Sequence, residues 1–276
     1  MKKESLNILV TGAASGIGRA ACERFRALGH EVWALDIAPV LDSDPERGFT
    51  ADITSEASMS AVADALRAAG VRLDVIVAAA GIHAMASLVE GDFEKLERLM
   101  EINLIGTMRT VHALHPLLSE RGRIVIVTSE VATLDPLPFN GLYSVSKCAL
   151  EAYSQALRQE LNLLGQRVVT VRPGAIETPL AAGSIRATEA LADSTELYKR
   201  QASRFSGIAK RFMGKPISPD RLSRVIARAA LSRHPRLGYN KHRSIGLLLL
   251  NLLPKRMQCS VIRILLGKSK KNANND

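Results

Sequence analysis

The sequence predicts an α/β fold in which one parallel sheet is covered by helices on both faces. Three observations carry this prediction. Short apolar runs alternate with stretches of helical periodicity, most of these runs are apolar throughout, and a glycine-rich segment joins the first run to the first helix. A strand that is buried on both faces needs apolar side chains in both directions, so uninterrupted runs favour a parallel sheet. An apolar fraction of 47% supplies a large core for 276 residues.

The expected elements follow one another along the chain. We expect strands at 6–10, 31–35, 73–78, 123–128 and 167–171, and helices at 18–28, 54–69, 92–118 and 142–164. Gly29 and Gly70 follow two of these helices, and glycine is common just past a helix C-terminus. Beyond residue 179 the pattern weakens: 181–215 is helix-prone but polar, 219–232 is amphipathic, and 236–240 forms a short last strand. The polar tail 267–276 is expected to be disordered.

The chain carries few signs of export. Its first apolar run is too short for a signal peptide and leads directly into the glycine segment. No uninterrupted apolar stretch approaches the roughly 18 residues that a membrane span needs. The three cysteines lie far apart, with neither a disulfide framework nor the spacing of a zinc site. We therefore expect a cytoplasmic protein without a metal.

Positive charge is concentrated in the last third of the chain. Residues 199–276 contain 19 Lys and Arg against 2 Asp and Glu, whereas the rest contains 18 against 25. This asymmetry predicts contact with something anionic. Nucleic acid is disfavoured, because Phe205, Phe212 and Tyr239 are too few for a stacking platform and no docking motif is present.

The glycine-rich segment 11–18, TGAASGIG, predicts a dinucleotide site. Glycine allows the tight turn and the close approach of backbone N–H groups to a pyrophosphate at the positive end of the helix dipole. A plain glycine-rich turn is the alternative, but a strand precedes the segment, a helix follows it, and Asp36 ends the second strand. A carboxylate at that place accepts hydrogen bonds from both ribose hydroxyls and repels a 2′-phosphate, which favours NAD over NADP.

Tyr143 and Lys147 are the candidate catalytic pair. A spacing of four places them one turn apart on the same face of a helix. A free tyrosine has a pKa of about 10, and we expect the neighbouring lysine, helped by the positive nicotinamide ring of a bound cofactor, to lower it so that Tyr143 acts as general base. Ser129 ends the strand before this helix, and its hydroxyl is placed to bond the reacting oxygen. A surface Tyr/Lys pair and a strand-capping serine are the alternatives.

These motifs resemble the short-chain dehydrogenase/reductase family, in which TGxxxGxG opens the fold and YxxxK follows a serine. The resemblance covers about residues 8–179 and continues more loosely to 240. It implies a Rossmann-like, doubly wound parallel sheet in three αβα layers. The implied organisation is one NAD-binding domain at 1–240, with a substrate lid at 180–215, and a basic, leucine-rich extension at 241–276.

The resemblance also implies individual roles. Asp52 would bind the adenine ring and Ile53 would pack on it, Asn103 would hold a water as a proton relay, and a Pro-Gly turn would orient the nicotinamide. Residues 78–81, AAAG, replace the family's NNAG, so we expect some loss of rigidity there but not of binding. The predicted catalytic residues are Asn103, Ser129, Tyr143 and Lys147. The predicted cofactor-binding residues are Gly12, Ser15, Gly16, Ile17, Gly18, Asp36, Asp52, Ile53, Ala79, Gly81, Tyr143, Lys147, Pro173, Gly174, Ile176 and Thr178.

The function implied is an NAD-dependent oxidoreductase that interconverts a lipophilic secondary alcohol and its ketone. Ser129, Phe139, Leu142, Tyr143 and Leu180 are the predicted substrate contacts. Alternatives are a ketoreductase for CoA- or carrier-linked 3-oxoacyl chains and a non-catalytic NAD-sensing scaffold. His83 follows Gly81 and is interpreted as an ordinary loop histidine, with a place at the edge of the active site as the less favoured alternative.

The ending resembles that of the 17β-hydroxysteroid and retinol dehydrogenase-like branch, where such an extension borders a lipophilic pocket or meets a membrane surface. Leucines flanked by Lys and Arg are typical of an interfacial helix, which would place the protein on the inner membrane face. A helix that covers the core or an oligomer interface fits equally well. The family commonly forms homodimers or homotetramers through the helix that carries Tyr143.

Overall fold

The computed structural model describes residues 5–40, 45–212 and 215–267. Seven parallel strands form one sheet in the order β3-β2-β1-β4-β5-β6-β7. The strands are β1 (Asn7–Thr11), β2 (Glu31–Asp36), β3 (Gly48–Thr50), β4 (Leu73–Ala78), β5 (Leu118–Val127), β6 (Arg167–Pro173) and β7 (Gly238–Lys241). This is the doubly wound α/β fold that the sequence predicts, and the strand order reverses between β1 and β4, where such folds bind their ligands.

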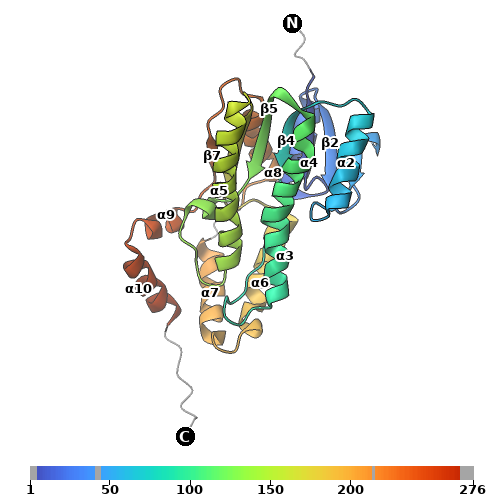
Figure 1. Cartoon of the computed structure of the whole chain (residues 1–276). Helices are drawn as coiled ribbons and strands as arrows, with labels where there is room; N and C mark the ends of the chain where they lie inside the picture. Colours follow the sequence, from blue (N-terminus) through green and yellow to red (C-terminus); the bar gives the residue numbers. More distant parts are fainter. Residues whose placement is uncertain (1–4, 41–44, 213–214, 268–276) are drawn as a thin grey trace.

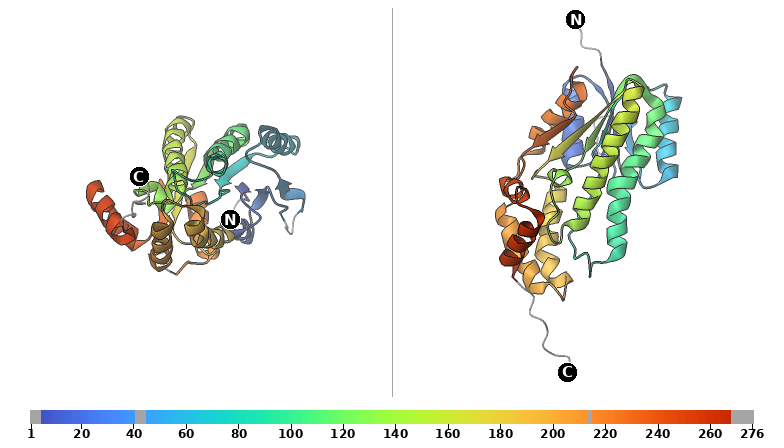
Figure 2. Two further views of the ribbon diagram at one scale, coloured as in Figure 1. Left: turned by 90° about the horizontal axis from the view of Figure 1, so that it is seen from below. Right: turned by 60° about the vertical axis from the view of Figure 1, so that its left-hand side comes forward.

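Helices cover both faces of the sheet (Figures 1 and 2). On one face lie α2 (Glu56–Ala68), α4 (Thr107–Leu114) and α5 (Gly141–Leu163), and on the other α1 (Gly16–Ala27) and α8 (Pro219–Leu231). Neighbouring strand residues point to opposite faces. Leu9, for example, packs in the α2–α4–α5 core, whereas Ile8 and Val10 pack against α1 and α8. The apolar runs of the sequence therefore supply two separate cores.

Four further helices lie beyond the carboxyl ends of the strands (Figure 1). Helices α6 (Pro179–Ala190) and α7 (Lys199–Phe212) occupy the predicted lid, and α9 (Ile245–Asn251) and α10 (Lys255–Leu266) form the extension. The short helices are η1 (Pro45–Arg47), η3 (His115–Leu117), η4 (Glu130–Thr133) and η5 (Leu191–Ser194). A small third core joins Phe139 and Phe205 to Leu266 of α10. Within the described ranges, no helix combines the length and apolarity needed to cross a bilayer.

Most predicted elements are confirmed within a few residues, with three exceptions. The edge strand β3 was not predicted, and β5 begins at Leu118 rather than 123. The helix expected at 92–118 is divided into α3 (Phe93–Met100), a π-helical turn η2 (Glu101–Gly106), α4 and η3. Residues 268–276, for which disorder was predicted, lie outside the described part of the chain.

Candidate active site

Two glycines shape the turn between β1 and α1. A Cβ at Gly12, whose φ is +72°, would lie 2.9 Å from the Ala80 backbone, and a Cβ at Gly18 would lie 2.1 Å from the Gly12 carbonyl oxygen. Only glycine fits such close approaches. The first turn of α1 contains no acidic residue, and its N-cap, Ser15, makes no capping hydrogen bond. The free N–H groups of this helix end therefore suit an anionic ligand such as a pyrophosphate.

A groove with a cavity volume of about 280 Å³ runs from this turn across the ends of β2 and β4. Most of the predicted cofactor-binding residues line it, namely Gly12, Ser15, Gly16, Ile17, Gly18, Asp36, Asp52, Ile53, Ala79, Gly81 and Thr178. Leu180, which was predicted as a substrate contact, lines the same groove. Pro173, Gly174 and Ile176 do not line it, and Ile176 is buried beside Ile217. The dinucleotide prediction thus fits the cavity along most of its length.

The Asp36 carboxylate stands at the mouth of the groove. One of its oxygens accepts a hydrogen bond from the Ala14 N–H, and the other accepts one from the Ala38 N–H, each at 3.0 Å. These bonds fix the carboxylate where the ribose of a dinucleotide is expected. No lysine or arginine stands at positions 12–18 or at 37 and 38.

Asp52 is held at the adenine end of the groove. Its Oδ1 accepts hydrogen bonds from the N–H and the hydroxyl of Thr54, both at 2.8 Å, and Arg98 lies 3.7 Å from its Oδ2. Burial alone would raise the pKa of Asp52, but these bonds and the Arg98 charge hold it below its ordinary value. Arg98 lines the groove and was not predicted, because it reaches this site from α3 across the tertiary fold.

The asparagines missing from residues 78–81 have a partial replacement. The Thr11 hydroxyl accepts hydrogen bonds from the N–H groups of both Ala79 and Ala80, each at 3.2 Å. Thr11 is almost fully buried, at 1% exposure. One side chain on β1 therefore ties down the end of β4, which offsets the expected loss of rigidity.

Ser129, Tyr143 and Lys147 meet behind Gly81. The hydroxyls of Ser129 and Tyr143 are hydrogen-bonded, and the Lys147 Nζ lies 5.9 Å from the centre of the Tyr143 ring. Lys147 is buried and donates a long hydrogen bond of 3.5 Å to the Val127 carbonyl. A Cβ at Gly81 would lie 3.4 Å from the Lys147 Nζ. The three predicted residues are thus together next to Gly81, which lines the groove, whereas Tyr143 and Lys147 themselves do not line it.

Desolvation dominates the electrostatics of Tyr143 and Lys147. Burial raises the pKa of Tyr143, the Ser129 hydrogen bond opposes this only in part, and the negative charge of Glu130 raises it further. Burial also lowers the pKa of Lys147 to about 8. Both groups lie in surroundings that favour their neutral forms. The expected lowering of the Tyr143 pKa depends on the positive nicotinamide ring as well as on Lys147, so it stays a prediction.

Asn103 lies in the π-helical turn η2 and is fully buried. Its side chain forms a pair of hydrogen bonds with the backbone N–H and carbonyl of Ile82, at 2.8 and 2.9 Å, and donates a third to the Ser146 hydroxyl at 3.1 Å. A Cβ at Gly81 would lie 3.0 Å from the Asn103 Oδ1. The side chain thus supports the loop under Gly81, and its role in a water relay stays a prediction.

His83 lies against Tyr143, which agrees with its less favoured interpretation as a residue at the edge of the site. Its ring lies edge-on to the Tyr143 ring, with the centres 4.5 Å apart, and its Nε2 is 3.0 Å from the Asn140 Oδ1. Burial lowers the pKa of His83 to about 4, so the ring is neutral near pH 7. No local pattern marks this contact, because it arises only when the loop after β4 folds over the start of α5.

The predicted substrate contacts lie in different surroundings. The Phe139 ring is buried and makes edge contacts with Tyr198 and Phe205 of the lid region, at centre distances of 5.9 and 5.6 Å. Phe139 therefore packs against the lid region. Leu142 is half-buried beside Tyr143. A contact of either residue with substrate stays a prediction.

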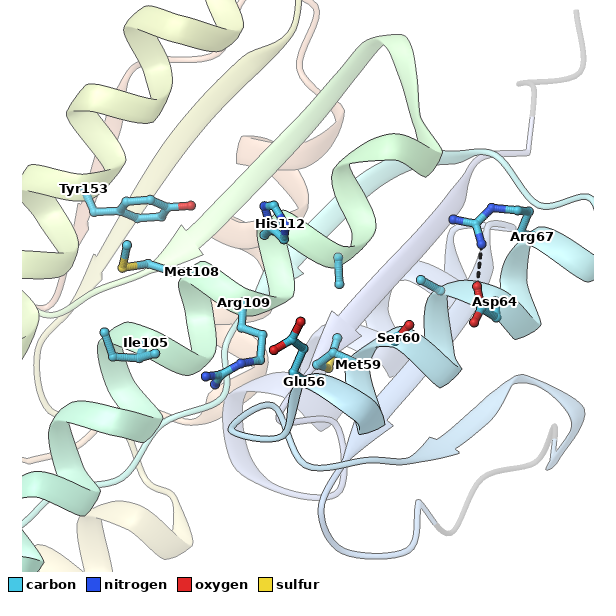
Figure 3. A pocket seen from close by; sticks show the side chains of 12 residues that line it. Glu56, Met59, Ser60, Asp64, Arg67, Ile105, Met108, Arg109, His112 and Tyr153 are labelled. Atoms are coloured by element: carbon cyan, nitrogen blue, oxygen red, sulfur yellow. Dashed lines mark hydrogen bonds and ion pairs between the residues drawn. The ribbon is translucent and has the colours of Figure 1, made fainter.

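A second hollow lies on the outer face of the helices that cover the first core. Its cavity volume is about 710 Å³, and α2, α4 and α5 line it with residues that include Glu56, Met108, Arg109 and Tyr153 (Figure 3). It is larger than the groove, but none of the predicted site residues lines it. Among the residues whose placement is described, no group of three or more His, Cys, Asp and Glu side chains could hold a metal ion.

Comparisons with known proteins agree with this geometry. The sequence profile described as short chain dehydrogenase matches residues 6–189. The chain is 32% identical over 179 residues to a 1-hydroxy-2-glutathionyl-2-methyl-3-butene dehydrogenase of Rhodococcus sp. strain AD45, covering 63% of this chain and 79% of that protein. It is 34% identical to an uncharacterised NAD-dependent oxidoreductase of Mycobacterium tuberculosis, covering 62% and 71%. A short-chain dehydrogenase structure from Streptomyces avermitilis superposes with a TM-score of 0.73 at 25% identity, covering 95% and 96%.

Proposed function

Because the chain belongs to the short-chain dehydrogenase family and is an oxidoreductase, we propose that it uses NAD to interconvert a lipophilic secondary alcohol and its ketone. The observation that supports this most directly is the meeting of Ser129, Tyr143 and Lys147 behind Gly81 at the glycine-lined groove. A scaffold that only binds NAD would have no need of this group.

The chain's own residues handle the proton. When bound, NAD supplies the hydride acceptor and a positive charge beside the phenol. In oxidation, Tyr143 takes the proton of the substrate hydroxyl at its phenolic oxygen, and the Ser129 hydroxyl donates a hydrogen bond to the same substrate oxygen. The Lys147 ammonium stabilises the phenolate against the burial that raises the pKa of Tyr143. Reduction follows the same steps in reverse.

The choice of NAD over NADP rests on Asp36. Its carboxylate is held in place by two backbone N–H groups, so it cannot easily move away from a 2′-phosphate. The negative charge would repel that phosphate, whereas two ribose hydroxyls can donate to it.

A lipophilic substrate is supported by the rim of the site. Glu90, in the loop after β4, accepts hydrogen bonds from the N–H groups of Glu196 and Leu197, each at 3.1 Å, which joins that loop to the lid region. Leu88 and Val89 directly precede Glu90, Leu197 is one of its partners, and these three apolar side chains are 61%, 72% and 56% exposed. Such a group of exposed apolar side chains is typical of a binding surface for an apolar molecule.

A substrate linked to CoA or another carrier is the second candidate. The positive charge of residues 199–276 supports it, as does the relative whose name specifies a glutathionyl alcohol. A panel of free alcohols, ketones and their CoA thioesters, followed by NADH absorbance at 340 nm, distinguishes the two.

Tyr143→Phe tests the mechanism. Loss of a positioned proton-transfer group lowers turnover by about 100- to 10,000-fold, and NAD binding should remain close to that of the wild type. Tyr153→Phe, on the same helix, is the matched control and should keep full activity. Unchanged turnover in Tyr143→Phe would refute the mechanism.

We also propose that the exposed face of α9 meets an anionic membrane surface. Ile245 and Leu249 on this helix and Leu252 just after it lie at i, i+4 and i+7 and are 73%, 60% and 79% exposed. Lys255 and Arg256 begin the next helix, and α9 and α10 project from the body of the molecule (Figure 1). Leu249→Glu should reduce flotation with vesicles that contain phosphatidylserine, whereas Leu163→Glu, a control on α5 that is 84% exposed, should not. Equal flotation of both would refute the contact.

Self-association through α5 and its neighbour α4 is a separate proposal. Ile105, Met108 and Val145 expose apolar side chains on this side of the molecule, near the second hollow. We expect a homodimer or homotetramer by light scattering, and a monomer for Val145→Glu. A monomeric wild type would contradict this assembly.

A further inference from the structure

Glu130 is a buried carboxylate next to the active site. It directly follows Ser129 and is only 9% exposed. Its Oε2 accepts a hydrogen bond of 2.6 Å from the backbone N–H of Ser244, the residue that caps the N-terminus of α9. The residue after the catalytic serine is thus bonded to the start of the C-terminal extension, 114 positions along the chain.

The same carboxylate also borders the turn after β6. A Cβ at Gly174 would lie 3.0 Å from the Glu130 Oε1 and 1.9 Å from the His242 carbonyl oxygen. Gly174 belongs to the Pro-Gly turn predicted to face the nicotinamide. Three segments therefore converge on Glu130: the catalytic serine, this turn, and the chain that leads into α9.

Further polar contacts extend the attachment along residues 130–135. The Arg243 guanidinium donates to the Thr133 hydroxyl at 3.1 Å, and the Asn251 Oδ1 accepts from the Asp135 N–H at 2.7 Å. The Asp135 carboxylate accepts a hydrogen bond from Gln258 at 2.9 Å and lies 3.1 Å from the Lys255 ammonium. We call this set of contacts between 130–135 and 243–258 the polar clasp.

The polar clasp attaches α9, whose side chains are at most half-buried. That helix has no buried residue, and α10 buries only Gln258 and Leu266. A carboxylate is costly to bury unless it is hydrogen-bonded and paired. Burial raises the pKa of Glu130, and the Ser244 N–H and the charges of Arg243 and His242 oppose this rise. The extension thus supplies a hydrogen-bond donor and positive charges that lower the free-energy cost of burying the Glu130 carboxylate beside Ser129.

We propose that Glu130 is a positioning residue through which the seating of α9 and α10 controls the position of Ser129 and the Pro-Gly turn. The consequence for activity rests on the proposed function, whereas the mechanical coupling does not. Any partner that shifts α9, including a membrane surface, would then act on the catalytic loop.

The charge of Glu130 gives this role a distinct signature. It raises the pKa of Tyr143. The other ionisable groups that face Tyr143 are Lys147 on its own helix and His83 on the loop after β4. Neither group is altered by a substitution at 130, so a change in the pH profile reports Glu130 itself.

Two substitutions at residue 130 distinguish the effect of the Glu130 charge from its effect on the position of the catalytic loop. Glu130→Gln keeps an acceptor for the Ser244 N–H and removes the charge, so kcat at its plateau should stay within about twofold while the acid limb of the oxidation profile moves to lower pH, because the Tyr143 pKa falls. Glu130→Ala removes the anchor and should lower kcat about tenfold or more, since misplacement of about 1 Å can cost about 100-fold. Glu120→Gln, at the exposed opposite end of β5, is the control and should change neither quantity.

Hydrogen exchange tests the coupling without any turnover. In full-length Asp135→Ala, which disturbs only the far end of the polar clasp, exchange should rise in α10 and also at the Val131 and Ala132 amides, which bond to Ser129. A rise in hydrogen exchange that is confined to α10 in Asp135→Ala, or full activity in Glu130→Ala, would overturn the proposal. Coupled exchange in a protein that shows no activity would support the coupling and contradict the proposed function instead.

Discussion

Replacing Lys147 by methionine should stabilise the protein while abolishing its activity. Lys147 is 5% exposed, and its ammonium has one long hydrogen bond of 3.5 Å. Burial lowers its pKa to about 8 from 10.5, and at about 1.4 kcal/mol per pKa unit this difference corresponds to about 3 kcal/mol. A methionine of similar length fills the same space without a charge to bury.

The gain in stability from Lys147→Met should depend on pH. Below pH 8 the ammonium is present in the folded and the unfolded chain, so the whole cost of burying it lowers the stability of the wild type. Between pH 8 and 10.5 the folded chain has released a proton that the unfolded chain still binds, so stability rises with pH. Above 10.5 both states are neutral and the cost disappears.

Urea unfolding without cofactor, at several values from pH 7 to pH 11, measures this difference. We expect Lys147→Met to exceed the wild type by about 3 kcal/mol near pH 7 and by little above pH 10.5. Lys95→Met is the control, because that side chain is 80% exposed, and should show no such trend. A Lys147→Met protein no more stable than the wild type at pH 7, or a gain that stays constant with pH, would refute a buried ammonium.

Three further substitutions test the groove and the core. In Gly18→Ala the new Cβ would lie 2.1 Å from a carbonyl oxygen of the same loop, so NADH binding followed by fluorescence should weaken about tenfold or more; Gly207→Ala, which meets open space, should bind normally. Asp36→Ala should raise the KM for NAD about tenfold and increase the ratio of NADP to NAD in kcat/KM; an unchanged ratio would contradict the cofactor assignment. Arg123→Met removes a buried guanidinium that bonds three carbonyls at the end of α8, so the free energy of unfolding should fall by about 3 kcal/mol. Arg121→Met, exposed on the same strand, should leave it unchanged.

The fold was predictable where strands are buried on both faces, because such strands are apolar throughout. The exceptions follow from the same rule. Strand β3 consists of three residues at the sheet edge and buries none of them. The first part of β5 contains the exposed Glu120 and Arg121, and its pairing with β4 shifts register between Leu73 and Val75. Neither segment has the apolar run that a strand prediction requires.

The site was predictable where chemistry depends on local spacing, as at the glycine turn and at Tyr143 and Lys147. Arg98 and Glu130 were not predicted because neither belongs to a motif, and His83 was ranked as an ordinary loop residue above its alternative as an edge of the site. The expected lowering of the Tyr143 pKa depends on the nicotinamide ring as well as on Lys147. The burial that raises this pKa is a property of the whole fold, which the spacing of the two residues does not report.

The C-terminal extension is attached to residues 130–135 by polar groups, while some of its apolar side chains are exposed to solvent. Ile245 and Leu249 of α9 are exposed and its other leucines are half-buried, whereas polar groups of Arg243, Ser244, Asn251 and Gln258 attach the extension to residues 130–135. Apolar burial stabilises a packed helix by about 25 cal/mol per Å², and α9, which has no buried residue, gains little from this source. A segment held by directional polar bonds can be shifted by one competing surface contact far more readily than one held by a core, and its bonds end at the residue that follows Ser129.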